Sequence, residues 1–162
     1  MKLTTPKKLT VIRGLPGSGK STLGRRLAAE SGAIFVEPDM FLLHGGKYFY
    51  TANRYEDAVK KALFFIKHAE CDVVYADVLP TLADVLRVHN AYFWCQTDAT
   101  VHHEFRLIAL RISVEEALAR NVHHVNEDDI RRMADSWQNC LGEERCLVGE
   151  FLFYESIQGA LK

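Results

Sequence analysis

The chain has 162 residues, of which 48% are apolar and 25% charged, and its net charge is −1. This length and balance are typical of one globular domain with its own core, so we expect residues 1–162 to form a single domain. A net charge near zero argues against a surface that binds phosphate backbone in bulk. The sequence contains no apolar run as long as a membrane span, and we expect no signal peptide at its N-terminus.

Four cysteines occur, at positions 71, 95, 140 and 146, and they form no Cys-x-x-Cys pair. A chain of this length does not need disulfide bonds to stabilise its core. We therefore expect reduced thiols and a cytoplasmic location.

The first half of the chain alternates short apolar runs with helical patterns. The run 9–12 predicts a buried strand that ends in a glycine loop, and residues 20–29 have the period of a helix. Residues 33–36 predict a second strand, which Glu37-Pro38 stops, and a loop with His44-Gly45-Gly46 follows. Residues 52–69 give the strongest amphipathic pattern. Its apolar positions are Tyr55, Ala58, Val59, Ala62, Leu63, Ile66 and Ala69.

The second half repeats this alternation. The expected elements are a strand at 72–76, a helix from Thr81, a strand at 105–112, a helix that Ser113 caps with Glu116, a helix at 126–139 and a last strand at 147–153. Residues 90–103 show no clear period. The whole pattern predicts an α/β fold: a three-layer sandwich with a mostly parallel five-stranded sheet, which binds ligands at the carboxyl ends of its strands.

The most specific motif is Gly-x-x-x-x-Gly-Lys-Ser, which lies between the first predicted strand and helix. Its glycines let successive backbone N–H groups point at phosphate oxygens, and the helix that follows adds its positive end. Lys20 is expected to reach the β and γ phosphates, and Ser21 to give a hydroxyl to Mg²⁺. The candidate nucleotide-binding residues are Gly14, Leu15, Pro16, Gly17, Ser18, Gly19, Lys20, Ser21 and Thr22.

Four segments together resemble a known family. The stretches 13–23, 37–41, 120–123 and 129–133 are similar, in order and spacing, to small P-loop kinase-like ATPase domains, which include the 5′-kinase domain of phage polynucleotide kinase. The similarity covers residues 9–140. It implies a P-loop NTPase fold of the nucleoside-kinase type with a short lid, ATP with Mg²⁺ as cofactors, and a hydroxyl group as phosphoryl acceptor.

The resemblance also implies roles for three residues. Asp39 matches the aspartate that acts as base toward the acceptor hydroxyl, a role that suits a carboxylate. Asp77 matches a strand-end aspartate that holds magnesium through water or contacts the acceptor, and a helix-capping role is an alternative. Arg120 matches a lid arginine over the phosphates, unless it pairs with Glu116 on a solvated helix face. Together with Lys20, Asp39 and Arg120 are the expected catalytic residues, and Ser21 and Asp77 the expected metal ligands.

The sequence departs from the family pattern at two places. Val78 and Leu79 follow Asp77 where relatives carry polar residues, which argues against polynucleotide recognition of the familiar type. His124 stands where the polynucleotide kinase has a second basic residue, and a histidine there would make catalysis weaker or pH-sensitive.

Aromatic residues and histidines have alternative interpretations. Tyr92, Phe93 and Trp94 could form a lip that stacks a base, although core packing or a dimer contact is the simpler reading. The doublets His102-His103 and His123-His124 do not indicate a structural metal, since adjacent side chains point apart and lack companion ligands. Arg131 and Arg132 fit a solvated helix face, with one of them facing the nucleotide as the alternative.

Three functions are compatible with these features. The first is a kinase that transfers the γ-phosphoryl group of Mg-ATP to a nucleic-acid 5′ end, a nucleoside or a small metabolite. The second is an ATP-binding switch, interaction domain or slow ATPase without an acceptor. The third is a toxin-like kinase for a cell-wall sugar nucleotide, for which 162 residues leave little room. Substrate identity and oligomeric state are not encoded in these motifs.

Overall fold

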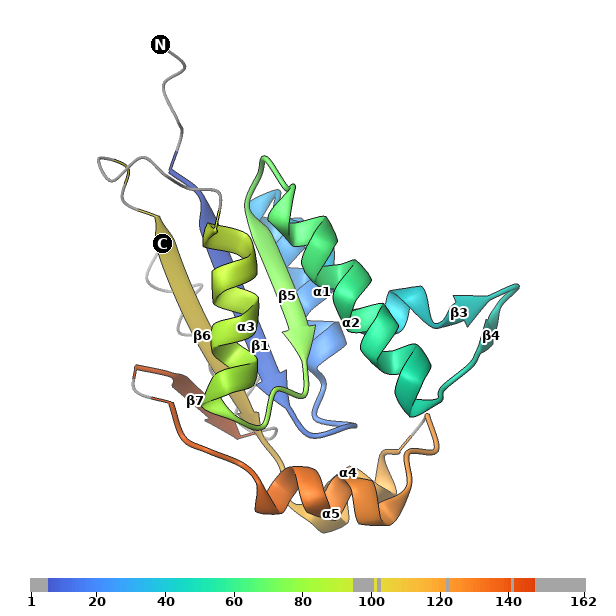
Figure 1. The fold of residues 1–162 in the computed structure, drawn as a ribbon. Coiled ribbons are helices and arrows are strands. Elements are labelled where there is room, and N and C mark those ends of the chain that lie inside the picture. The colour runs from blue at the N-terminus through green and yellow to red at the C-terminus, as the bar shows by residue number, and fades with distance from the viewer. Residues whose placement is uncertain (1–5, 95–100, 102, 122, 141, 148–162) are drawn as a thin grey trace.

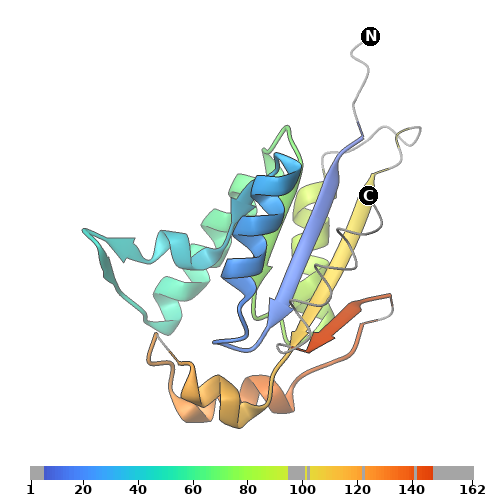
Figure 2. The same ribbon diagram turned by 180° about the vertical axis from the view of Figure 1, so that it is seen from behind.

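The computed structural model describes residues 6–94, 101, 103–121, 123–140 and 142–147. Their central feature is a five-stranded sheet with the order β2-β5-β1-β6-β7, in which each neighbouring pair is parallel (Figures 1 and 2). The strands are β1 (Lys8–Gly14), β2 (Ile34–Val36), β5 (Val73–Asp77), β6 (Glu104–Arg111) and β7 (Glu144–Leu147). The prediction of a mostly parallel five-stranded sheet is confirmed.

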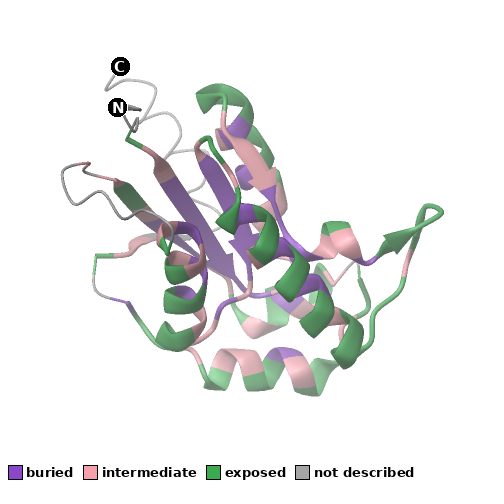
Figure 3. Cartoon of the chain, turned by 45° about the horizontal axis from the view of Figure 1, so that its top comes forward, coloured by how far each residue is buried: buried purple, intermediate pink, exposed green. Residues whose placement is uncertain are grey.

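Helices cover both faces of this sheet. On one face α1 (Lys20–Ser31) packs Leu23 and Ala28 against Ile12, whereas α2 (Ala52–Lys67) and α3 (Leu82–Phe93) cover the other face. The side chains of β1 alternate accordingly, because Leu9 and Val11 join the core under α2 and α3. Figure 3 shows the buried strands between helices whose outer faces are exposed.

Two smaller units lie near the carboxyl ends of the strands (Figure 1). The first follows β2 and consists of a short 3-10 helix η1 (Pro38–Phe41) and a hairpin of β3 (Leu43–His44) and β4 (Lys47–Tyr48). The second consists of α4 (Val114–Ala119) and α5 (Glu127–Asp135). Its buried residues Ala117 and Ile130 pack against Leu15 of the glycine loop, so this unit is built onto the loop.

Several local predictions are confirmed by backbone and capping geometry. The amphipathic pattern at 52–69 buries Ala58, Val59, Ala62 and Ile66 in α2. Ser113 and Glu116 form the expected capping box at α4. Thr81 and Asp84 form another at α3, so Thr81 rather than Asp77 caps that helix.

One predicted loop and two predicted boundaries are wrong. The loop predicted around His44-Gly45-Gly46 contains the hairpin β3–β4. The final strand begins at Glu144 instead of Leu147, and the predicted positions 148–153 lie outside the described residues. Helix α5 ends at Asp135 instead of Asn139.

A buried arginine at the end of β1 explains the early end of α5. The Arg13 guanidinium lies 4.0 Å from the centre of the Trp137 ring and donates to the carbonyls of Gln138 (3.0 Å) and Pro80 (2.9 Å). It also reaches the Cys140 sulfur (2.9 Å) and the Glu143 carboxylate (3.2 Å). Residues 137–140 and 143 therefore leave the helical path and lie around this charge.

Two further sequence-based expectations concern cysteines and membranes. Cys71 and Cys140 are free thiols, as predicted for them. Within the described ranges, every helix is too short or too polar to cross a lipid bilayer.

Candidate active site

The glycine loop connects the central strand β1 to α1, where it turns sharply. Gly17 (φ 79°) and Gly19 (φ 91°) have left-handed backbone conformations that favour glycine. A Cβ atom on Gly17 would also come within 2.9 Å of the Arg120 Cβ and 3.2 Å of its carbonyl oxygen. The sequence of this loop is therefore required both for its own turn and for contact with the end of α4.

The inner residues of the loop support it from below. Gly14 leaves no room for a side chain, since a Cβ there would lie 2.5 Å from the Ser18 hydroxyl oxygen and 2.9 Å from the Leu110 carbonyl oxygen. Leu15 packs in the core of the α4–α5 unit. Ser18 is buried, and its hydroxyl has no hydrogen-bond partner among the described residues. These three residues shape the loop and do not line the cavity described next.

A cavity of about 570 Å³ opens beside the loop. It joins the P-loop, α1, the η1–β4 segment, the ends of α2 and β5, and the α4–α5 unit. The predicted site residues that line it are Pro16, Gly17, Gly19, Lys20, Ser21, Thr22, Asp39, Asp77 and Arg120. Pro16 and Arg120, which are 104 positions apart in the sequence, thus meet at one edge of the sheet, the edge that binds ligands in parallel α/β folds.

Lys20 is held inside the loop by a neutral partner. Its ammonium group donates to the Leu15 carbonyl oxygen at 3.0 Å. Burial lowers the pKa of Lys20, and the nearby carboxylates of Asp77, Asp39 and Glu37 oppose this shift. The side chain is therefore positioned to exchange a backbone carbonyl for a phosphate oxygen.

Glu37 is a site residue to which the sequence analysis gave no role. Its carboxylate is nearly buried, accepts a hydrogen bond from the Ser21 hydroxyl (2.5 Å) and pairs with the Arg25 guanidinium (2.8 Å). Glu37 directly follows β2, so the strand-end reasoning applied to Asp77 would have found it.

The oxygen atoms beside Ser21 fit a magnesium ion. Mg²⁺ prefers hard oxygen ligands and is commonly held by one or two carboxylates together with substrate phosphates. The Ser21 hydroxyl and the Glu37 and Asp77 carboxylates line the same cavity. Among the described residues, no group of three or more His, Cys, Asp or Glu side chains is arranged to hold a metal ion by itself. This donor set suits an ion that shares its coordination with phosphates.

Asp39 contacts the hairpin that the sequence analysis had treated as a loop. The Tyr48 hydroxyl donates to one Asp39 carboxylate oxygen at 3.0 Å. The Tyr48 ring stacks on His123, with centroids 4.5 Å apart and planes inclined by 25°. Through Tyr48, the Asp39 carboxylate is connected to both the hairpin and the segment after α4.

Asp77 is buried at the end of β5. One of its carboxylate oxygens accepts hydrogen bonds from the Tyr55 hydroxyl and from the Val78 N–H (2.7 Å). Burial raises the pKa of Asp77 to about 6, although these two hydrogen bonds and Lys20 act in the opposite direction. A carboxylate with a raised pKa at a cavity wall is typical of functional sites.

The basic residues after β6 separate into two groups. Arg120 ends α4 and lines the cavity, whereas Glu116 accepts hydrogen bonds from Ser113 in its capping box. Arg131 pairs with Glu127 (2.7 Å) and Arg132 with Asp129, on the exposed face predicted for them. His123 lines the cavity rather than His124, whose backbone has a φ of 52°.

The aromatic residues at the end of α3 do not reach this cavity. The Tyr92 hydroxyl donates to the Lys8 carbonyl oxygen (3.3 Å), at the start of β1, whereas the phosphate loop follows the end of that strand. Tyr92 is buried and Trp94 is exposed. The alternative in which residues 92–94 form a lip that stacks the base of a nucleotide in the loop is therefore wrong. Residues 95–100 and 102 lie outside the described residues.

A parallel sheet, a phosphate loop after its central strand and carboxylates after two neighbouring strands define a P-loop domain of the kinase-like class. More specifically, residues 9–138 match the AAA_33 family, described as an AAA domain. The match spans most of the chain, so the chain belongs to this family.

One curated relative shares part of the sequence. Over 94 residues the chain is 30% identical to a protein of Mycoplasma genitalium whose name describes an ABC transporter ATP-binding protein, MG303. The match includes 52% of this chain and 25% of that protein. The chain thus spans about a quarter of the length of this relative.

Solved structures with similar folds include several kinases. A gluconokinase from Sinorhizobium meliloti 1021 matches with a TM-score of 0.63 and 13% identity, covering 95% of this chain and 88% of that chain. A sugar kinase from Janibacter sp. HTCC2649 gives 0.62 and 13%, with 94% of both chains covered. A chain of the Pnkp1/Rnl/Hen1 RNA repair complex gives 0.60 and 19%, covering 83% and 45%. At these identities the similarity shows a shared fold, and a particular relation to phage polynucleotide kinase stays a prediction.

Proposed function

We propose that this protein is an ATP-dependent kinase that transfers the γ-phosphoryl group of Mg-ATP to a hydroxyl group. The observation that carries this proposal is the position of Lys20 and Asp39 in the walls of one cavity. Lys20 belongs to a loop that binds triphosphates, and Asp39 supplies a carboxylate where an acceptor hydroxyl can enter. The kinase-like fold and the kinases among its structural neighbours support the same conclusion.

The phosphate side of the cavity has several roles in this proposal. The loop N–H groups and Lys20 hold the β and γ phosphates, and Arg120 offsets charge on the transferring group. Ser21, with Glu37 beside it, would hold magnesium, which would offset charge on the β and γ phosphates when bound.

The acceptor side performs the proton transfer. The acceptor oxygen forms a bond to the γ-phosphorus, while the bond from that phosphorus to the bridging β–γ oxygen breaks and ADP leaves. The proton of the acceptor hydroxyl passes to Asp39, whose other carboxylate oxygen is held by Tyr48. The products are ADP and a phosphate monoester.

The free thiols of Cys71 and Cys140 fit a reducing cytoplasm, where ATP is abundant.

The direct test is an acceptor screen with γ-labelled ATP that spans 5′-hydroxyl oligonucleotides, nucleosides and sugars. We expect label transfer to at least one class, and loss of that transfer in Asp39→Asn with the fold intact. Asp57→Asn is a matched control, because Asp57 lies on the exposed side of α2 beside Lys60. Full transfer by Asp39→Asn would refute the role of Asp39.

A second candidate is an ATP-binding switch or ATPase that has no acceptor. It is favoured by Leu79, which is buried at a position where the resemblance predicts a polar residue. Release of γ-phosphate that none of the compounds accelerates would support this function. Faster loss of ATP with a single compound would exclude it.

A further inference from the structure

One side of the cavity is formed by three tyrosine rings. Tyr48 comes from the hairpin, Tyr50 from the connection that follows it, and Tyr55 from α2. The rings of Tyr50 and Tyr55 lie 5.9 Å apart, and Tyr48 stacks on His123. We call Tyr48, Tyr50 and Tyr55 the tyrosine wall. Such a wall offers flat apolar faces to a ligand.

The side chains beside the tyrosine wall offer hydrogen-bond acceptors to a ligand but few free donors. The hydroxyl hydrogens of Tyr48 and Tyr55 are directed at Asp39 and Asp77. Burial and these carboxylates raise the pKa of both tyrosines, so the hydroxyls stay neutral donors to the carboxylates. The remaining carboxylate oxygens can only accept, so a ligand here has to supply hydroxyl or amine donors.

The cations that line the cavity are used on its phosphate side. Lys20 donates to the Leu15 carbonyl oxygen inside the loop, and Arg25 pairs with Glu37. Arg120 packs against Gly17 of the same loop. Within the described ranges, these three residues are the lysines and arginines in the cavity lining. Triphosphate and magnesium chemistry would engage them.

Outside the lining, two arginines near the tyrosine wall, Arg132 and Arg54, are already engaged by neighbouring side chains. Arg132 is close enough to Tyr50 to influence its pKa, but it pairs with Asp129, which acts on Tyr50 in the opposite direction. The Arg54 guanidinium lies 5.5 Å from the centre of the Phe49 ring. An anionic acceptor would therefore meet Asp39 and Asp77 without a dedicated positive charge, a costly arrangement.

From this arrangement we propose that the phosphoryl acceptor is an uncharged ring compound with at least two hydroxyl groups. One hydroxyl faces Asp39 and is phosphorylated, a second donates to Asp77, and the ring packs on the tyrosine wall. Nucleosides and neutral cyclic sugars belong to this class, whereas phosphate esters, sugar acids and polynucleotide ends do not. The inference rests on the proposed kinase function and specifies its substrate class.

The test compares matched compounds that differ by one anionic group. Adenosine is compared with adenosine 3′-monophosphate, and glucose with glucuronate, in γ-labelled transfer assays with Mg-ATP. We expect kcat/KM to be at least about tenfold higher for the uncharged member of a pair that is phosphorylated. Tyr50→Ala should raise KM for that compound about tenfold with little change in kcat, because stacking on the ring is lost. Phe64→Ala, which changes an exposed aromatic residue on α2, is the matched control.

The outcomes separate this inference from the proposed function. Transfer to the anionic members in preference to the uncharged ones would overturn the inference and leave the kinase function standing. An unchanged KM in Tyr50→Ala would remove the tyrosine wall from acceptor binding. If none of the four compounds is phosphorylated while the broader screen yields an anionic acceptor, the substrate class is wrong. If that screen yields no acceptor at all, both proposals fail.

Discussion

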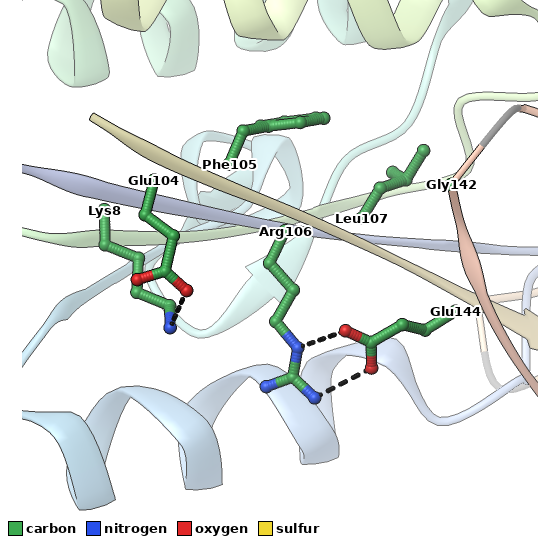
Figure 4. A pocket seen from close by; sticks show the side chains of 7 residues that line it. All are labelled: Lys8, Glu104, Phe105, Arg106, Leu107, Gly142 and Glu144. Carbon is green, nitrogen blue, oxygen red and sulfur yellow. Dashed lines mark hydrogen bonds and ion pairs between the residues drawn. The ribbon is translucent and has the colours of Figure 1, made fainter. Parts of the chain in front are cut away.

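Two hollows of the same volume, about 570 Å³ each, lie at different places on the sheet. One is the cavity beside the phosphate loop, at the carboxyl ends of the strands. The other runs along β6 and is lined by Lys8, Glu104, Arg106 and Glu144, among others. Figure 4 shows that in this second hollow Lys8 is directed at Glu104 and Arg106 at Glu144.

The two hollows differ in how their charges are satisfied. In the second hollow, Lys8 pairs with Glu104 at 2.6 Å, and Arg106 binds Glu144 through two hydrogen bonds of 2.7 and 2.9 Å. In the cavity, the ammonium of Lys20 is held by a carbonyl and the carboxylate of Asp77 by neutral donors. Neutral partners fix the position of a charge without cancelling it. The two hollows have the same volume, so volume does not distinguish them. They differ because neutral partners hold Lys20 and Asp77, whereas the charged side chains of the second hollow bind one another.

The largest expected effect contrasts a lysine from each hollow. Lys20→Ala should lower the rate of phosphoryl transfer by about 10³-fold, because a cation that stabilises the transferring phosphoryl group is removed. Lys8→Ala should leave the rate within about twofold, because its exposed pair with Glu104 has no role in the site. Steady-state kinetics of both variants give the answer. A similar loss of rate in both would end the distinction between the hollows.

The next effect concerns the cost of burying the Asp77 carboxylate. Since its pKa is raised from 3.8 to about 6, the folded state keeps a proton that the unfolded chain has released within this window. The free energy of unfolding should therefore fall by up to about 3 kcal/mol as the pH rises from 3.8 through 6. Asp77→Asn should flatten this dependence in urea titrations at several pH values. An equal fall in the variant would assign the effect to another group.

A smaller effect is expected for the residue next to Ser21. Glu37→Gln removes a negative charge beside the Ser21 hydroxyl, so the magnesium concentration for half-maximal rate should rise about tenfold. Glu30→Gln is its control, because Glu30 forms an exposed pair with Arg26. Rates measured against magnesium at fixed ATP will show the shift. No shift would place the ion away from Glu37.

The smallest effect tests the second hollow by itself. Glu144→Gln weakens the partly exposed pair with Arg106, which should lower the free energy of unfolding by about 0.5–1 kcal/mol. The transfer rate should not change. A large loss of rate with unchanged stability would show that the second hollow has a function that its paired charges conceal.

The sequence was sufficient to predict what depends on local pattern. The alternation of apolar runs predicted the parallel sheet, and the spacing of Gly14 and Lys20 predicted the loop, because both are encoded within a few residues. The family resemblance selected Asp39 and Asp77, which the structure places in one cavity with the loop.

The remaining features depend on contacts between distant residues. Tyr48 meets Asp39 only because a hairpin forms, and it meets His123 only because the α4–α5 unit folds over the same edge. The predicted end of α5 was wrong because the partners of Arg13, which lies more than 120 positions earlier, include Gln138 and Cys140, beyond that helix. No short window of sequence contains both Tyr48 and His123, or both Arg13 and Gln138.

The buried Arg13 also determines how far this chain can be shortened and still function. Arg13 immediately precedes Gly14, yet its partners Gln138, Cys140 and Glu143 all come after α5. A version cut back to Asp135 would keep every residue of the cavity lining but leave the buried cation next to the loop with the Pro80 carbonyl and without these three partners. Such a loss costs about 3–5 kcal/mol, a large share of the stability of a small domain. Attempts to shorten or fuse this protein should therefore treat residue 143 as part of the nucleotide site.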